Sequence, residues 1–225
     1  MIAVKAVAID IDGTITDETR AVNCKTVVEL RKIEIPVILV TGNVMCYART
    51  AAKLLGFSEI VVAENGGVVR FEYDGKDLIL GDKQKCLDAM ELLSEHFPVE
   101  PLDLELRLSE VALRRTFPIE DAEKLLNLEA VGVKIVDSGF AYHLMDKSVS
   151  KGKALEIVAE RLEISLDEFV AIGDSENDID MLNAVGYGVA VANAHPSLKR
   201  VAKLVTEASN GDGVIEALKK IGVLR

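Results

Sequence analysis

The stretch Asp10-Ile11-Asp12-Gly13-Thr14 directly follows an apolar run at residues 4–9, which predicts a buried strand. Two carboxylates separated by one residue therefore stand where that strand ends. The strand ends at one edge of a parallel sheet lie together, and α/β proteins usually bind their ligands there. Taken alone, the stretch also fits an ordinary turn, because Asp and Gly are common turn residues. The segments around it favour a site over a turn.

Strands and helices alternate on both sides of this stretch. The order of strand, helix, strand, helix and strand is typical of a parallel sheet. Apolar runs predict further strands at residues 37–40, 60–63, 169–172, 188–191 and 204–205. Helical spacing and cap residues predict helices at 23–32, 151–162, 176–184 and 213–220. Two more are expected, one that follows Asn43 and ends at about Leu55 before Gly56, and one that begins at Pro196.

The pattern changes between about residues 81 and 150. A helix is expected at 83–96, an alternating strand at 102–108, a strand at 111–115, a helix at 119–128, and a hairpin from 133–136 and 140–145. Two strands after each helix indicate antiparallel pairing, unlike the flanking segments. The sequence therefore predicts an α/β core from residues 1–80 and 151–225, with an inserted α+β domain at 81–150.

Composition and charge exclude several classes of protein. A hydrophobic fraction of 49% and a charged fraction of 28% are those of a globular chain. The net charge of -11 disfavours nucleic acid as a partner. Three widely spaced cysteines form neither a zinc motif nor a disulfide framework and suggest reduced, buried thiols. No bilayer-length apolar run and no signal-peptide pattern occur, so we expect no membrane partner and a cytoplasmic location.

Four places carry chemistry that fits together. They are Asp10 with Asp12, the triplet Thr41-Gly42-Asn43, Lys151, and the run from Gly173-Asp174 to Asp178. Three or four carboxylates brought together require a cation, and oxygen ligands of this kind suit Mg²⁺. A threonine hydroxyl, amides ahead of a helix and a lysine suit a phosphate. Together these groups supply what phosphoryl transfer needs.

Each of these places has a plainer interpretation when it is taken alone. Thr41-Gly42-Asn43 fits a helix cap, Lys151 fits a solvated surface lysine, and Gly173-Asp174 fits a turn. Their order along the chain and their positions after strands favour the shared site.

The same residues resemble the four ordered motifs of the haloacid dehalogenase-like phosphatases, over nearly the whole chain. The matching segments are Asp10 to Thr14, Thr41, Lys151-Gly152, and Gly173 to Asp178. The insert resembles the type IIB cap of that superfamily, and its size is most similar to that of the archaeal phosphoglycolate phosphatases. The resemblance implies a Rossmann-like core, a mobile cap and magnesium-dependent hydrolysis of a small phosphate monoester, with 2-phosphoglycolate expected.

The resemblance also implies roles for individual residues. Asp10 would attack phosphorus and become an aspartyl phosphate, and Asp12 would act as the general acid and base. Phosphate binding would fall to Thr41, Gly42, Asn43 and Lys151. The resemblance places the magnesium ligands at Asp10, Asp12 through its backbone carbonyl, Asp174 and Asp178, the last in or just behind the first coordination sphere.

The substrate-selecting residues and the rival functions stay open at this point. Most basic residues of the insert are expected to be solvated, and none is assigned to the substrate; they are Arg107, Arg114, Arg115, Lys134 and Lys147. His143 fits a packed strand residue. The alternatives are a broad sugar-phosphate phosphatase, a phosphosugar mutase and a non-enzymatic phosphoacceptor domain. The second acid, Asp12, argues against the last, and either a monomer or a homodimer is compatible with the sequence.

Overall fold

Eight strands form the central sheet, and most of them are the short apolar runs expected from the sequence. The structure, a computed structural model, describes residues 3–129 and 131–225. In spatial order the strands are β12 (Leu204–Val205), β11 (Tyr187–Ala190), β10 (Phe169–Gly173), β1 (Ala6–Ile9), β2 (Val37–Val40), β3 (Val61–Ala63), β4 (Val68–Arg70) and β5 (Leu78–Ile79). The strands from β12 to β3 are parallel, and β4 and β5 add an antiparallel edge.

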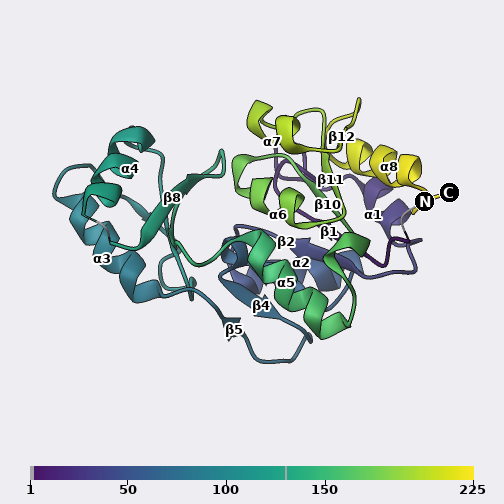
Figure 1. The fold of residues 1–225 in the computed structure, drawn as a ribbon, viewed down its shortest axis with the longest axis horizontal. Coiled ribbons are helices and arrows are strands. Elements are labelled where there is room, and N and C mark those ends of the chain that lie inside the picture. Colours follow the sequence, from purple (N-terminus) through teal and green to yellow (C-terminus); the bar gives the residue numbers. More distant parts are fainter. Residues whose placement is uncertain (1–2, 130) are drawn as a thin grey trace.

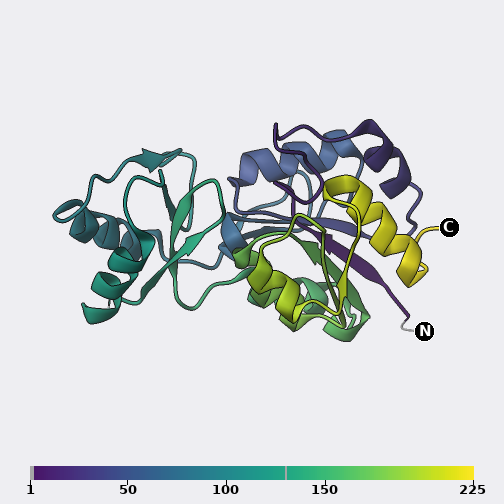
Figure 2. The ribbon, with the colours of Figure 1, turned by 90° about the horizontal axis from the view of Figure 1, so that it is seen from above.

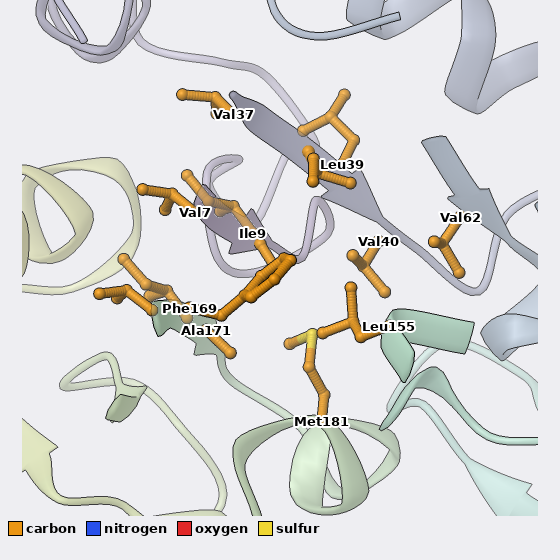
Figure 3. Packing of buried hydrophobic residues seen from close by; sticks show 14 of the residues in the cluster. Val7, Ile9, Val37, Leu39, Val40, Val62, Leu155, Phe169, Ala171 and Met181 are labelled. Carbon is orange, nitrogen blue, oxygen red and sulfur yellow. The ribbon is translucent and has the colours of Figure 1, made fainter. Parts of the chain in front are cut away.

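Strand β1 lies at the centre of this sheet, between β10 and β2. Every residue of β1 is buried, and Ile9 aligns with Ile172 on one side and Leu39 on the other. Figure 3 shows Ile9 among Val7, Leu39 and Phe169 in the apolar core. Strands buried on both faces are expected to be continuously apolar, and this explains why the runs do not alternate.

Helices cover both faces of the sheet. They are α1 (Cys24–Leu30), α2 (Met45–Leu55), α5 (Lys151–Leu162), α6 (Ile179–Ala184), α7 (Pro196–Val201) and α8 (Asn210–Ile221). In Figure 2, α1, α2 and α8 lie on one side of the strands, and α5, α6 and α7 lie on the other. Short 3-10 turns, η1 (Glu64–Gly66), η2 (Leu166–Glu168) and η3 (Glu176–Asp178), complete the loops.

A second, smaller unit stands at one end of the molecule (Figure 1). Its antiparallel sheet has the order β6 (Pro101–Leu102), β7 (Val111–Leu113), β9 (Tyr142–Asp146) and β8 (Val133–Asp137), and its helices are α3 (Lys83–Ser94) and α4 (Ile119–Leu128). These helices pack on one face of the sheet and enclose a separate apolar cluster that includes Leu93, Leu113 and Leu144. The parallel-sheet core with a small antiparallel cap confirms the predicted fold class.

Several local predictions are confirmed by the backbone. The Asn23 side chain accepts a hydrogen bond from the Lys25 amide at the start of α1, and Gly56 ends α2 in the left-handed conformation at φ 72°. Pro196 occupies the first turn of α7. The helix expected at 176–184 is divided, because η3 precedes α6.

The strand expected at residues 102–108 is wrong. Pairing stops after Leu102, and Asp103 has a positive φ of 50°, which turns the chain out of the sheet. The alternation of apolar residues had suggested a half-buried strand, yet Leu106 is exposed and Arg107 is buried. Hydrogen bonds to the core unit, described below, hold this segment instead of strand pairing.

The expectation of buried thiols is right for one cysteine out of three. Cys86 is buried in the cap, whereas Cys24 and Cys46 are exposed near the starts of α1 and α2. All three are free thiols, as expected. Within the described ranges, no helix has both the length and the apolar composition needed to cross a bilayer.

Two linkers join the cap to the core, and they lie close together. The entering linker runs beside Gly67, whose carbonyl accepts hydrogen bonds from the Leu80 and Gly81 amides. The returning linker passes Gly66, where an added Cβ would lie 2.2 Å from the Ser150 carbonyl oxygen. Gly66 therefore permits a backbone contact that a larger residue would block.

Candidate active site

Three carboxylates meet at the carboxyl edge of the central sheet. Asp10 follows β1, Asp174 follows β10, and Asp178 ends η3. One ligand oxygen from each lies within 4.8 Å of the others. This convergence follows from β1 and β10 being parallel neighbours, which bring together residues more than 160 positions apart.

Lys151, at the start of α5, neutralises part of this cluster. Its Nζ donates to Asp10 Oδ1 and to Asp178 Oδ1, both at 2.6 Å, and the residue is 0% exposed. Burial would lower the pKa of Lys151, but the charges of Asp10 and Asp178 outweigh burial and raise it. Lys151 is therefore a charged, fully buried group, and the solvated-lysine interpretation is wrong.

Burial and mutual repulsion still disfavour the charged forms of Asp10 and Asp174. Burial, together with the charges of Asp178 and Asp174, raises the pKa of Asp10 despite Lys151. Burial and the charge of Asp178 raise the pKa of Asp174 to about 7. A cluster of this kind gains stability from a bound cation. The donor set of hard carboxylate oxygens therefore fits Mg²⁺, with Asp10 and Asp174 best placed to bind it.

Asp178 has a different environment from the other two acids. Its Oδ1 accepts from Lys151, and its Oδ2 accepts from the backbone amides of Asp174 and Ser175, at 3.0 and 3.1 Å. Both oxygens are thus used in fixing the loop and the lysine. This geometry favours a role for Asp178 behind the metal ligands.

Gly13 makes room for Asp174. Its φ is 84°, and an added Cβ would lie 2.4 Å from Asp174 Oδ2. The neighbouring Thr14 hydroxyl donates to Asp174 Oδ1 at 2.8 Å. The stretch after β1 therefore positions the acid that follows β10.

Asp12 lies outside this cluster of three acids and lines a cavity. It accepts a short hydrogen bond from Asn43 Nδ2, and the Arg20 guanidinium lies 4.0 Å from its Oδ1, which has no hydrogen-bond partner among the described residues. Burial raises the pKa of Asp12, although Arg20 and the Asn43 bond oppose the rise. Burial therefore favours the neutral acid.

The triplet Thr41-Gly42-Asn43 lines the same cavity beside Asp12, to which the Asn43 side chain donates. Thr41 Oγ1 accepts from the Asn43 amide at 3.1 Å, so its own hydrogen is available to donate. Helix α2 begins later, with Val44 at its N-cap, and the triplet is not a helix cap. Gly42 is packed closely, since an added Cβ would lie 3.0 Å from Asn65 Oδ1.

The cavity between core and cap has a volume of about 100 Å³. Core and cap side chains both line it: Asp10, Asp12, Arg20, Thr41, Gly42, Asn43, Leu102, Asp103, Arg107, Ser138, Phe140, Ala141, His143, Ser175 and Asn177. The Arg20 guanidinium lies 4.3 Å from the centre of the Phe140 ring, and this contact spans the cavity from core to cap.

A polar network in the cap was missed by sequence reasoning. Arg107, expected among the solvated residues, is 4% exposed and forms a short ion pair with Glu110. Glu110 also accepts from Asn65 Nδ2 at 3.0 Å and lies 2.8 Å from His143 Nδ1. Burial raises the pKa of Glu110, but the charges of His143 and Arg107 and the hydrogen bonds lower it overall.

Glu64 is a second missed residue, and it anchors the cap to the core. Its carboxylate accepts from the Leu108 amide, at 3.0 Å, and from the Ser109 amide and hydroxyl, both at 2.8 Å. The sequence did contain a signal, because Glu64 follows a parallel strand at the same sheet edge as Thr41. No comparable signal existed for Glu110, which lies between the strands expected at 102–108 and 111–115.

The chain matches a known family over most of its length. The family is described as haloacid dehalogenase-like hydrolase, and the match covers residues 7–106 and 117–218. Relatives named phosphoglycolate phosphatase include one from Archaeoglobus fulgidus, 62% identical over 98% of each chain, and one from Methanosarcina acetivorans, 46% identical over 96% of this chain and 95% of the other.

Solved structures agree with this match. One is the crystal structure of a Thermoplasma acidophilum protein with a TM-score of 0.87 and 27% sequence identity. The match covers 98% of this chain and 99% of that protein. A Bacteroides thetaiotaomicron phosphatase of the haloalkanoate superfamily shares the fold, with a TM-score of 0.81 and 24% sequence identity. That match covers 98% of this chain and 96% of the other. The chain belongs to the haloacid dehalogenase-like hydrolase family.

Proposed function

We propose that the protein hydrolyses 2-phosphoglycolate to glycolate and phosphate, with Mg²⁺ and through an aspartyl phosphate on Asp10. The observation that carries this proposal is the position of Asp10, which lines the cavity between the buried Lys151 and the second acid, Asp12. Relatives at up to 62% identity carry the name phosphoglycolate phosphatase, and this supports the substrate.

Asp10 is the nucleophile. Lys151 holds its Oδ1, which leaves the second oxygen to attack phosphorus. As the new bond from Asp10 to phosphorus forms, the bond between phosphorus and the glycolate oxygen breaks. The departing alkoxide takes its proton from Asp12, whose burial favours the neutral acid at the start.

The second half of the reaction regenerates both acids. Asp12, now a carboxylate, takes a proton from water as the water oxygen attacks phosphorus. The bond between phosphorus and Asp10 breaks, phosphate leaves, and Asp12 again carries a proton. Asn43 holds Asp12 in place through its side-chain amide.

The phosphoryl group is held from two sides. The Thr41 hydroxyl and the Gly42 amide are the donors on one side, where the Asn43 amide fixes the Thr41 oxygen, and the Lys151 charge acts on the other. Asp10, Asp174 and the Asp12 backbone carbonyl would hold Mg²⁺, with Asp178 behind them. When bound, the ion neutralises charge on the acids and on the phosphoryl oxygens.

The size of the cavity supports a small substrate. About 100 Å³ is well below the roughly 300 Å³ at which pockets for drug-sized ligands begin. A two-carbon acid phosphate therefore fits better than a sugar phosphate. We further propose that residues 81–150 act as a substrate-selecting domain on a core of residues 1–80 and 151–225, in a cytoplasmic monomer or homodimer.

A substrate panel with matched variants tests this function. Phosphate release is measured from 2-phosphoglycolate, sugar phosphates and p-nitrophenyl phosphate, with Mg²⁺ and with a chelator. We expect the highest kcat/KM for 2-phosphoglycolate, loss of turnover in chelator, and a fall of about 1000-fold or more in Asp10→Asn. The control, Asp121→Asn, changes an exposed acid on α4 and should match wild type. Substantial turnover by Asp10→Asn would exclude the proposed nucleophile.

A further inference from the structure

One cationic side chain of the cap faces the reaction cavity. Arg107 lines the cavity together with Asp10, Asp12 and Thr41 and is almost fully buried. The other basic residues considered in the cap have partners elsewhere: Arg114 pairs with Glu100, Arg115 with Asp137, Lys134 approaches Asp180, and Lys147 bonds to Asn127. Arg107 is therefore the cap cation placed to meet a substrate.

The guanidinium of Arg107 is only partly used by the protein. Its Nη1 donates to the Gly42 carbonyl at 3.1 Å and to Glu110. Its Nε is buried and has no hydrogen-bond partner within the described ranges. A buried donor without a partner destabilises the fold, so its persistence indicates an acceptor that the protein itself does not supply.

The geometry of a guanidinium defines that acceptor. Nε and Nη2 form one planar edge with two parallel N–H groups, which matches the two oxygens of a carboxylate. Glu110 occupies Nη1, on another edge, and leaves the Nε edge open. Neither a hydroxyl nor an apolar group would satisfy both donors, and the Nε edge of Arg107 is therefore specific for a planar anion.

Glu110 fixes the direction of this edge. The Glu110 carboxylate is held from three sides, by Arg107, by Asn65 Nδ2 of the core, and by His143 of β9. His143 is in turn fixed by Ser138 Oγ, 3.1 Å from its Nε2. Arg107 consequently has little rotational freedom, and the entropy cost of binding an anion there is reduced.

The same contacts place the edge close to the phosphate-binding triplet. The Gly42 carbonyl that binds Nη1 belongs to the residue between Thr41 and Asn43. An anion on the Arg107 edge therefore lies a short distance from a phosphoryl group held by Thr41. The spacing suits a short acid better than one with a long carbon chain.

We propose that Arg107 binds the carboxylate of the leaving group through its Nε edge and makes the enzyme selective for short acid phosphates. This inference rests on the proposed phosphatase function and adds the residue that recognises the substrate. Asp103 also lines the cavity and repels an anionic leaving group, so the charge of Arg107 offsets its effect.

The test compares two substrates that differ only in the carboxylate. These are 2-phosphoglycolate and 2-hydroxyethyl phosphate, which has a neutral CH₂OH in place of the acid. The measured quantity is the ratio of their kcat/KM values in wild type, Arg107→Gln, Arg107→Lys and the control Arg114→Gln. Arg114 lies in the same cap with a side chain 62% exposed, and its variant should keep the wild-type ratio.

We expect Arg107→Gln to lower the ratio by about 100-fold, mainly through a higher KM for 2-phosphoglycolate. Arg107→Lys should keep part of the preference, because it retains charge without the two-pronged edge. A fall in both activities by the same factor would indicate damage to the fold and overturn the inference, as would an unchanged ratio. Failure of the proposed function is seen separately, in wild type, as an absence of 2-phosphoglycolate turnover.

Discussion

Lys151 shows at the scale of one residue how the fold supports a charged site. It is among the largest side chains that the fold buries completely, and its ammonium lies between two carboxylates at 2.6 Å from each. Removing one partner from a buried ion pair leaves an uncompensated charge, which is far more costly than losing an exposed pair. Both the stability of the core and the chemistry of the site therefore depend on this lysine.

We predict that Lys151→Met destabilises the metal-free protein by roughly 3–5 kcal/mol, since Asp10 and Asp178 lose their shared cation. Urea unfolding at neutral pH in chelator measures the change. The matched control is Lys153→Met, two residues along the same helix, where the lysine is exposed and the expected effect is within about 0.5 kcal/mol. Equal stabilities for the two variants would contradict the prediction.

At the scale of elements, an ion pair fastens α3 to the last cap strand beside the linkers. Lys85 Nζ lies 2.9 Å from Asp146 Oδ2, at the end of β9, and the Ser148 amide donates to Asp146 Oδ1 at 2.9 Å. Burial raises the pKa of Asp146, but the Ser148 amide and Lys85 lower it from 3.8 to about 2 overall. The charged form of Asp146 is thus favoured in the folded state.

The lowered pKa of Asp146 gives a pH-dependent contribution to stability. It is fully present above the unfolded pKa of 3.8 and is lost as the pH falls through about 2. We predict that Asp146→Asn lowers the free energy of unfolding by about 2 kcal/mol at pH 6. This difference from wild type should shrink between about pH 4 and pH 2. Urea unfolding across this range measures it.

The control for this prediction is Asp88→Asn, which changes an exposed acid on α3. The free energy of unfolding of Asp88→Asn should differ little from that of wild type, and the difference should not change with pH over the same range. A difference for Asp146→Asn that is constant down to pH 2 would show that the carboxylate charge is not what stabilises this end of β9.

Elements were predictable where periodicity and local geometry agree. The runs that became β1, β2 and β10 are apolar because both faces are buried, and Gly56 and Pro196 set helix ends by backbone geometry alone. Residues 102–108 do not form the expected strand because Asp103 turns the chain and the Leu108 amide binds Glu64 of the core, a contact that no local pattern encodes. The convergence of Asp10 and Asp174 was predictable because both residues follow parallel strands. The Arg107–Glu110 pair was not predictable, because it depends on contacts between distant segments.

At the scale of the whole molecule, the acidic cluster exists only in the folded chain. Asp10 directly follows the first strand, and Asp174 and Asp178 come from segments beyond the cap insert. A cation that binds the cluster therefore binds the folded state and not the unfolded one. Ligands of this kind stabilise in proportion to the logarithm of their concentration.

We predict that Mg²⁺ at about 100 times its Kd stabilises the protein by about 2.7 kcal/mol, which raises Tm by roughly 5–10 °C for a chain of this size. Thermal unfolding in Mg²⁺ and in chelator measures the shift. Asp174→Asn should remove most of the increment because a ligand is lost, while Asp121→Asn should keep it. An equal shift in both variants would place the ion elsewhere.

The pairing of β1 with β10 also bears on how the chain assembles. Ala6 aligns with Phe169, and the entire cap is synthesised between them. Gly66 and Gly67 hold the two cap linkers side by side, so a folded cap joins its own ends and shortens the loop that β1 and β10 must close. The insertion that completes the cavity thereby lowers the entropic barrier to closing the centre of the sheet, and slow cap folding would delay the formation of the core.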